Sequence, residues 1–122
     1  MKLIKLLFIM MVTLFITSSY SYADKIRGEY ATKNQVGQDY YLNRCSSCHG
    51  DGARGGNMAS IREWKQIFSN NASELLELHT DDKSTVEILK YFKSASFKKE
   101  SPLMLNLLQE FAYDSDNIPT CN

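Results

Sequence analysis

Two cysteines and a histidine stand close together in this chain, at Cys45, Cys48 and His49. In an exported protein, a Cys-x-x-Cys-His pattern is the signature of covalent haem attachment. Two thiols three positions apart on one helical turn lie on the same side, so each can bond to one vinyl group of a porphyrin. The next residue, His49, is then carried under the ring, where its imidazole can bind the iron axially. The motif therefore predicts a fold built around one covalently attached haem c.

The N-terminal segment, residues 1–23, has the three parts of a secretory signal. Lys2 and Lys5 give it a positive start, an apolar run covers 6–16, and a polar stretch ends in small residues up to Ala23. The apolar run is shorter than the roughly 20 residues that a helix needs to span a bilayer. We expect cleavage after Ala23 and export to the periplasm. The alternative is an uncleaved N-terminal anchor, which would hold the protein at the membrane.

Length and composition allow a single small domain. The chain has 122 residues with 14 Lys+Arg and 14 Asp+Glu, so it lacks the positive charge typical of a nucleic-acid-binding protein. A hydrophobic content of 43% is too high for a disordered chain. The expected organisation is a signal peptide over 1–23, an N-terminal extension over 24–33, a haem domain over 34–114 and a C-terminal tail over 115–122.

Hydrophobic periodicity and capping residues predict an all-α domain, and no alternating run of useful length indicates a strand. The segment 51–57 is rich in glycine and is expected to be a loop. Helices are predicted over 34–44, from Ser60 with Glu63 as a capping box, from Asn71 through His79, from Ser84 with Glu87, and from Ser101 with Pro102 at the first helical position. Because these helices are short, packing around a haem would stabilise them.

Other interpretations of the cysteine motif have less support. A thioredoxin-like dithiol belongs to a βαβ pattern, which the sequence lacks. A structural zinc site needs about four ligands, and only His79 and Cys121 remain to complete one. A chance occurrence of the motif is rare beside an export signal. If Cys45 and Cys48 hold the haem, Cys121 either forms an intermolecular disulfide or is a tail residue without a role.

Gly37 and Tyr41 stand eight and four positions before Cys45. With the motif they resemble the N-terminal pattern of class I (mitochondrial-type) monohaem cytochromes c, specifically over 37–52 and only in general architecture afterwards. The resemblance implies a small helical fold around one haem, in which the glycine lets the first helix cross the last one closely, with the aromatic packed nearby. It also implies an electron carrier, not an enzyme, that shuttles single electrons between redox proteins.

The sequence offers three candidates for the sixth iron ligand: Met104, His79 and Met58. Met104 is the first choice, because it follows a predicted helix and loop as the family's distal methionine does; alternatively it is a core residue of the last helix. His79 is the second choice and shares a helical face with two leucines; alternatively it is a half-buried helix end. Met58 follows His49 closely and has the least support. A Met/His pair raises the potential and bis-histidine ligation lowers it, whereas an open position would make the chain a haem enzyme, for instance peroxidase-like, or a ligand-binding sensor.

The sequence departs from the family's pattern between Gly50 and Ser101, where it has no proline. Many of these cytochromes use a proline carbonyl there to accept a hydrogen bond from the proximal histidine. Another carbonyl would therefore have to orient His49. The single tryptophan, Trp64, is expected in the core, with haem packing or a hydrogen bond to a propionate as the alternative.

Four lysines cluster shortly before Met104. They would steer an acidic redox partner, periplasmic or membrane-bound, if the haem edge opens near 96–104. The alternative is that the lysines form an ordinary solvated surface. The four lysines are Lys90, Lys93, Lys98 and Lys99.

Overall fold

The computed structural model describes residues 31–117. Over this range all regular elements are helical, which confirms the predicted all-α class. The helices are α2 (Gln35–Arg44), α3 (Ser46–His49), α4 (Gly52–Gly56), α5 (Ile61–Ile67), α6 (Ser73–Leu78), α7 (Val86–Phe92) and α8 (Ala95–Glu110), with 3-10 turns at Asn70–Ala72 and Lys83–Thr85. The predicted signal peptide, most of the predicted extension and the end of the tail lie outside the described residues. None of the helices within 31–117 is long and apolar enough to cross a membrane.

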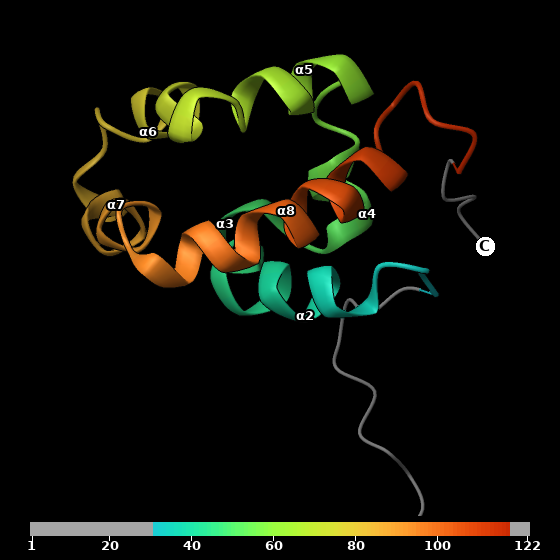
Figure 1. Cartoon of the computed structure of the whole chain (residues 1–122), viewed down its shortest axis with the longest axis horizontal. Helices are drawn as coiled ribbons and strands as arrows, with labels where there is room; N and C mark the ends of the chain where they lie inside the picture. Colours follow the sequence, from blue (N-terminus) through green and yellow to red (C-terminus); the bar gives the residue numbers. More distant parts are fainter. Residues whose placement is uncertain (1–30, 118–122) are drawn as a thin grey trace, which may run out of the picture.

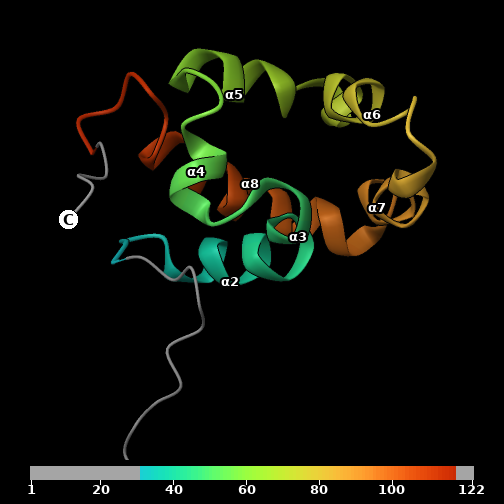
Figure 2. The same cartoon turned by 180° about the vertical axis from the view of Figure 1, so that it is seen from behind.

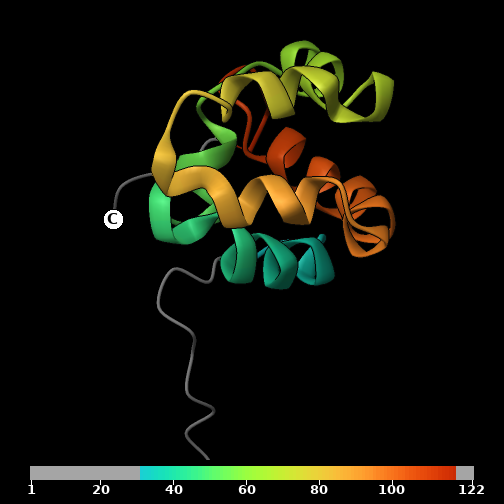
Figure 3. The same cartoon turned by 90° about the vertical axis from the view of Figure 1, so that its left-hand side faces the viewer.

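Helix α8 runs through the middle of the molecule and contacts α2, α4, α5 and α7. Helix α2 lies along one side of it, while α5 and α6 lie on the other and α7 closes one end (Figure 1). Seen from behind, α3 and α4 lie between α2 and the α5–α6 layer (Figure 2). The view from the α7 end shows α7 between that layer and α2 (Figure 3). Helices α5, α6 and α7 thus form an arc around the segment that carries the cysteine motif.

The core is built on one face of α8. Its apolar residues recur at helical spacing, so they share the face that meets the other helices. Burial of each such side chain contributes about 1.5–3 kcal/mol to folding. The core residues of α8 have exposed fractions of 0–4%; they are Phe97, Met104, Leu107 and Leu108, with Phe111 at the C-cap.

Helices α2 and α8 cross at a glycine. A Cβ atom built on Gly37 would lie 2.2 Å from the carbonyl oxygen of Leu103, so only a residue without a side chain allows this approach. One turn further along α2, Tyr41 is 2% exposed. A Cβ atom on Gly55 would lie 2.0 Å from its hydroxyl oxygen, so α4 also approaches α2 through a glycine.

Helix α5 begins as predicted from its capping residues. The Ser60 side chain accepts a hydrogen bond from the Glu63 backbone N–H at 3.2 Å, and the Ser60 N–H donates to the Glu63 carboxylate at 2.8 Å. Both halves of the predicted capping box are therefore present.

The predictions for α4 and α8 were wrong. The segment 51–57, predicted to be a loop, contains α4, and the Asp51 side chain caps it by accepting from the Arg54 N–H at 2.9 Å. The N-cap of α8 lies seven positions before the predicted cap Ser101, because Ser94 accepts a hydrogen bond from the Phe97 N–H at 3.1 Å. Pro102 lies on the exposed side of α8, where water can solvate the carbonyl that its missing N–H leaves free.

The starts of α6 and α7 also differ from prediction. Helix α6 begins at Ser73, because the three residues before it, Asn70 to Ala72, have φ angles of 50°, 56° and 57°. A left-handed backbone there excludes the helix predicted from Asn71. Helix α7 begins after a 3-10 turn in which Asp82 accepts from the Ser84 N–H at 2.8 Å, so Ser84 is not its N-cap.

Candidate functional site

The cysteine motif forms a single helical turn directly after α2. The Cys45 N–H donates to the carbonyl of Tyr41 at 2.8 Å, and the His49 N–H donates to the carbonyl of Cys45 at 3.1 Å. The turn ends at Gly50, whose φ of 76° is favourable only for glycine and takes the chain away from the motif immediately after the histidine. The backbone therefore holds both cysteines and the histidine on one short segment.

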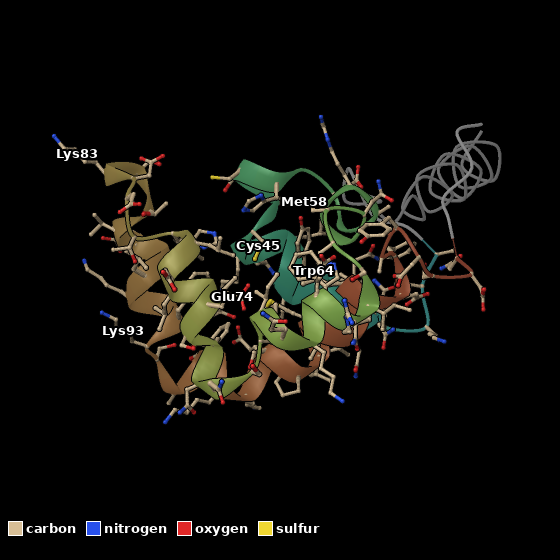
Figure 4. The ribbon with its side chains drawn as sticks, turned by 90° about the horizontal axis from the view of Figure 1, so that it is seen from above. Cys45, Met58, Trp64, Glu74, Lys83 and Lys93 are labelled. Carbon is tan, nitrogen blue, oxygen red and sulfur yellow. The ribbon has the colours of Figure 1, made fainter. Side chains whose placement is uncertain are left out.

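Both cysteines of the motif are free thiols. Cys45 is half-buried and packs against the core, whereas Cys48 is exposed. Burial raises the pKa of Cys45 to about 12, so its sulfur stays protonated at neutral pH. In the view from above, Cys45 lies toward the middle of the molecule (Figure 4). One turn thus presents two sulfurs, one toward the core and one at the surface.

The imidazole of His49 faces a second imidazole, that of His79. The ring centres are 5.9 Å apart and the ring planes are inclined at 80°. Burial, and then the proximity of His79, lower the pKa of His49, which favours its neutral form. Neutral imidazole is the form that binds metals. Within residues 31–117 the His49 ring has no hydrogen-bond partner.

Three neighbours hold His79 in place at the end of α6. Its Nδ1 lies 2.8 Å from the carbonyl oxygen of Leu75, its own carbonyl accepts a hydrogen bond from the Thr85 hydroxyl, and its ring meets that of Phe92 edge-on at 5.1 Å. A carbonyl oxygen can only accept, so Nδ1 carries a proton, and Nε2 is the nitrogen that the neutral ring would offer to a metal. The sequence placed His79 on a helix, but it gave no sign that the ring would face His49.

The other ligand candidates lie in different surroundings. Met104 is 2% exposed on α8, next to the point where α8 crosses α2 at Gly37. Met58 is 59% exposed, between α4 and α5. Trp64 is buried as expected for a core residue, and its indole N–H donates to the carbonyl of Gly56 at 2.7 Å. That N–H is therefore engaged by the backbone.

The sequence predicted that a carbonyl other than a proline's would orient His49, and the described residues provide none. The carbonyl that does orient an imidazole belongs to Leu75 and acts on His79. The contact with a backbone carbonyl that we expected at His49 is thus found at His79.

A polar cluster that the sequence analysis did not anticipate ties the motif to α7 and α8. The Arg44 guanidinium lies 4.4 Å from the centre of the Tyr91 ring, and its Nε is 3.6 Å from the carboxylate of Glu100. The Tyr91 hydroxyl donates to the same carboxylate at 2.6 Å. Because Arg44 immediately precedes Cys45, these contacts fix the motif relative to two distant helices. Their separation along the chain left no local pattern to detect.

All four lysines of the predicted cluster are exposed. Lys90 forms an ion pair with Glu87 at 2.8 Å. Figure 4 shows Lys93 and, at a separate point, Lys83 projecting from the α7 end of the molecule. The four lysines are therefore accessible to solvent on α7, on α8 and between these helices.

The site can supply two imidazoles and two thiols to a cofactor. No group of three or more His, Cys, Asp or Glu side chains between residues 31 and 117 is arranged to hold a metal ion. In a covalently attached haem, the two thiols would bond to the porphyrin and an imidazole would be available to the iron, which takes histidine as an axial ligand. The donor set thus fits a haem.

Comparison with protein-family models, with curated proteins and with solved structures finds no match to this chain.

Proposed function

We propose that this protein is an exported c-type cytochrome that carries single electrons between redox proteins. One haem c would be attached at Cys45 and Cys48, with His49 as the proximal iron ligand. The observation that carries the proposal is the α3 turn. It presents two free thiols beside an imidazole that has no hydrogen-bond partner within the described chain.

The residues of the turn have separate roles in this proposal. Each thiol adds across one vinyl group, so that sulfur bonds to one carbon and the thiol hydrogen passes to the other, with no oxidant required. The neutral His49 imidazole is ready to bind iron. A bound haem supplies an iron that alternates between the ferric and ferrous states. The polypeptide attaches that group, orients it and limits its contact with water.

The architecture around the motif supports a fold of the cytochrome c type. The first described helix crosses the last one at Gly37, and Tyr41 packs beside the crossing. This is the arrangement that the resemblance to class I cytochromes c implies for these two positions. Residues 1–23 would direct the chain to the periplasm, where haem attachment of this type takes place.

An electron carrier fits the site better than a haem enzyme or sensor. A carrier needs no acid, base or nucleophile of its own, because the cofactor holds the chemistry. The exposed lysines at the α7 end would attract an acidic partner protein, in the periplasm or at the membrane. An enzyme or sensor would instead need an axial position that exchanges its ligand.

Intact mass of the mature protein, produced together with haem-attachment machinery, tests the proposal. We expect the mass of the polypeptide plus one haem, and complete loss of covalent haem in the Cys45→Ala/Cys48→Ala double variant. Cys121→Ala is the matched control and should retain the haem. A wild-type mass equal to that of the amino acids alone, with the two thiols free or joined to each other, would disprove the proposal.

A further inference from the structure

We infer that His79 is the second axial ligand, opposite His49, so that the iron of this cytochrome has two histidine ligands. This inference rests on the proposed function, because it requires a haem at Cys45 and Cys48. It replaces Met104, the first choice from the sequence, with the residue whose ring faces His49.

The spacing of the two imidazoles suits a shared metal. Two imidazoles on opposite sides of one ion, each bound through one nitrogen at about 2 Å, have ring centres about 6 Å apart. The observed separation between His49 and His79 is 5.9 Å. The separation of the two ring centres is therefore the one that a shared metal ion requires.

The surroundings of His79 are those of a metal ligand. Metal-binding histidines commonly donate their second ring N–H to a carbonyl or carboxylate, which fixes the tautomer and the ring orientation. The Leu75 carbonyl accepts such a hydrogen bond from His79 Nδ1 at 2.8 Å, and Phe92 restricts the ring from one side. The hydroxyl of Thr85 anchors the backbone of His79. Nε2 is left free of hydrogen bonds from the described chain.

Accessibility separates His79 from Met104. A side chain that binds a cofactor must keep surface free for it, as the half-buried His49 and His79 do. Met104 is 2% exposed, so protein already encloses it. The adjacent Leu103 carbonyl packs on Gly37, and α8 cannot shift to expose Met104 without opening its contact with α2. Met58, at 59% exposed, does have free surface; what favours His79 over it is the 5.9 Å separation between the His79 and His49 rings.

Two histidine ligands would define the kind of carrier. With both axial positions filled by protein, no position is open for oxygen, peroxide or another small ligand. The potential would be lower than that of a Met/His cytochrome, because methionine ligation raises it. The partners would then be donors and acceptors that work at low potential.

Near-infrared magnetic circular dichroism of the ferric wild-type protein tests the inference without any substitution. We expect the low-spin transition at the energy characteristic of bis-histidine ligation, and no red charge-transfer band of an iron–methionine bond. A Met/His signature, or a high-spin spectrum, would overturn the assignment of His79.

Two matched variants identify the residue. His79→Gly should lose the low-spin spectrum and regain it when free imidazole is added, which also shows that the variant is folded. Met104→Leu should keep the wild-type spectrum. A haem-loaded His79→Gly protein that stays low-spin without imidazole would reject His79 while leaving the proposed function intact. Absence of covalent haem from the wild type would reject both proposals.

Discussion

At the scale of single residues, Tyr41 stands out because its buried hydroxyl lacks a hydrogen bond within the described chain. It is 2% exposed, and its hydroxyl is a buried polar atom without a hydrogen-bond partner among the described residues. Burial, with Cys45 and Asp51 nearby, raises the pKa of Tyr41 well above its ordinary value of 10. A buried hydroxyl that forms no hydrogen bond costs about 1–3 kcal/mol.

Removing this hydroxyl should therefore stabilise the protein. We expect Tyr41→Phe to raise the free energy of unfolding by about 1 kcal/mol, measured by urea denaturation of the haem-loaded protein, because no hydrogen bond is lost. Tyr40→Phe, at a half-buried position one residue away, is the control and should change stability little. A loss of stability in Tyr41→Phe would show that the hydroxyl bonds to a group outside the described chain.

The sequence identified Cys45, Cys48 and His49 as candidates, because their relationship is local and one helical turn fixes it. It ranked Met104 ahead of His79 as the second axial ligand, whereas we propose the reverse order. That choice depends on where α6 ends relative to α3, which tertiary packing decides. Both residues lie on a helical face with apolar neighbours in the sequence, and their burial and tertiary contacts distinguish them.

At the scale of elements, the helix boundaries show what local signals can predict. The α5 start was predicted correctly because both members of its capping box lie within four positions. The α8 start was missed because Ser101 before Pro102 is itself a plausible beginning. The buried Phe97 extends the apolar face of α8 one turn further back, where Ser94 provides the cap. Packing of that face decided between two serines that the sequence alone leaves equivalent.

The two serines give a direct test of the α8 boundary. Ser94→Ala removes the acceptor for the Phe97 N–H and should lower the free energy of unfolding by about 1 kcal/mol. Ser101→Ala lies inside the helix, where alanine has the higher propensity, and should be neutral or stabilising by up to about 0.5 kcal/mol. Urea denaturation of both variants measures the difference. If Ser101→Ala were the more damaging change, the helix would begin at the proline as first predicted.

At the scale of the whole molecule, the crossing of α2 and α8 links the fold to the site. The two helices come from opposite ends of the described chain, and α3 to α7 are enclosed between them in sequence. Cys45 follows α2 directly, while Arg44 at the end of α2 reaches Glu100 on α8 and Tyr91 on α7. A change at the crossing should therefore move the thiols relative to the arc that carries His79.

Gly37→Ala tests this link. A Cβ at this position meets a backbone carbonyl at 2.2 Å, so the helices must separate. We expect the free energy of unfolding to fall by about 3 kcal/mol, at the upper end of overpacking effects, and the yield of haem-loaded protein to fall with it. Denaturation and the ratio of haem absorbance to protein measure the two effects.

Gly52→Ala is the matched control, because it also adds a methyl group to a helical glycine. The nearest atom there is the end of the Leu107 side chain at 3.1 Å, which has to shift by only a few tenths of an ångström, whereas the backbone carbonyl at the crossing would have to move much further. The cost should stay within about 1 kcal/mol, since the higher helix propensity of alanine offsets the contact. Equal losses in the two variants would contradict the crossing as the determinant of the site. A larger loss at Gly37, with haem retained in Gly52→Ala, would support the crossing as that determinant. The close approach of α2 and α8 would then set the positions of the two thiols and the two imidazoles relative to the proposed haem.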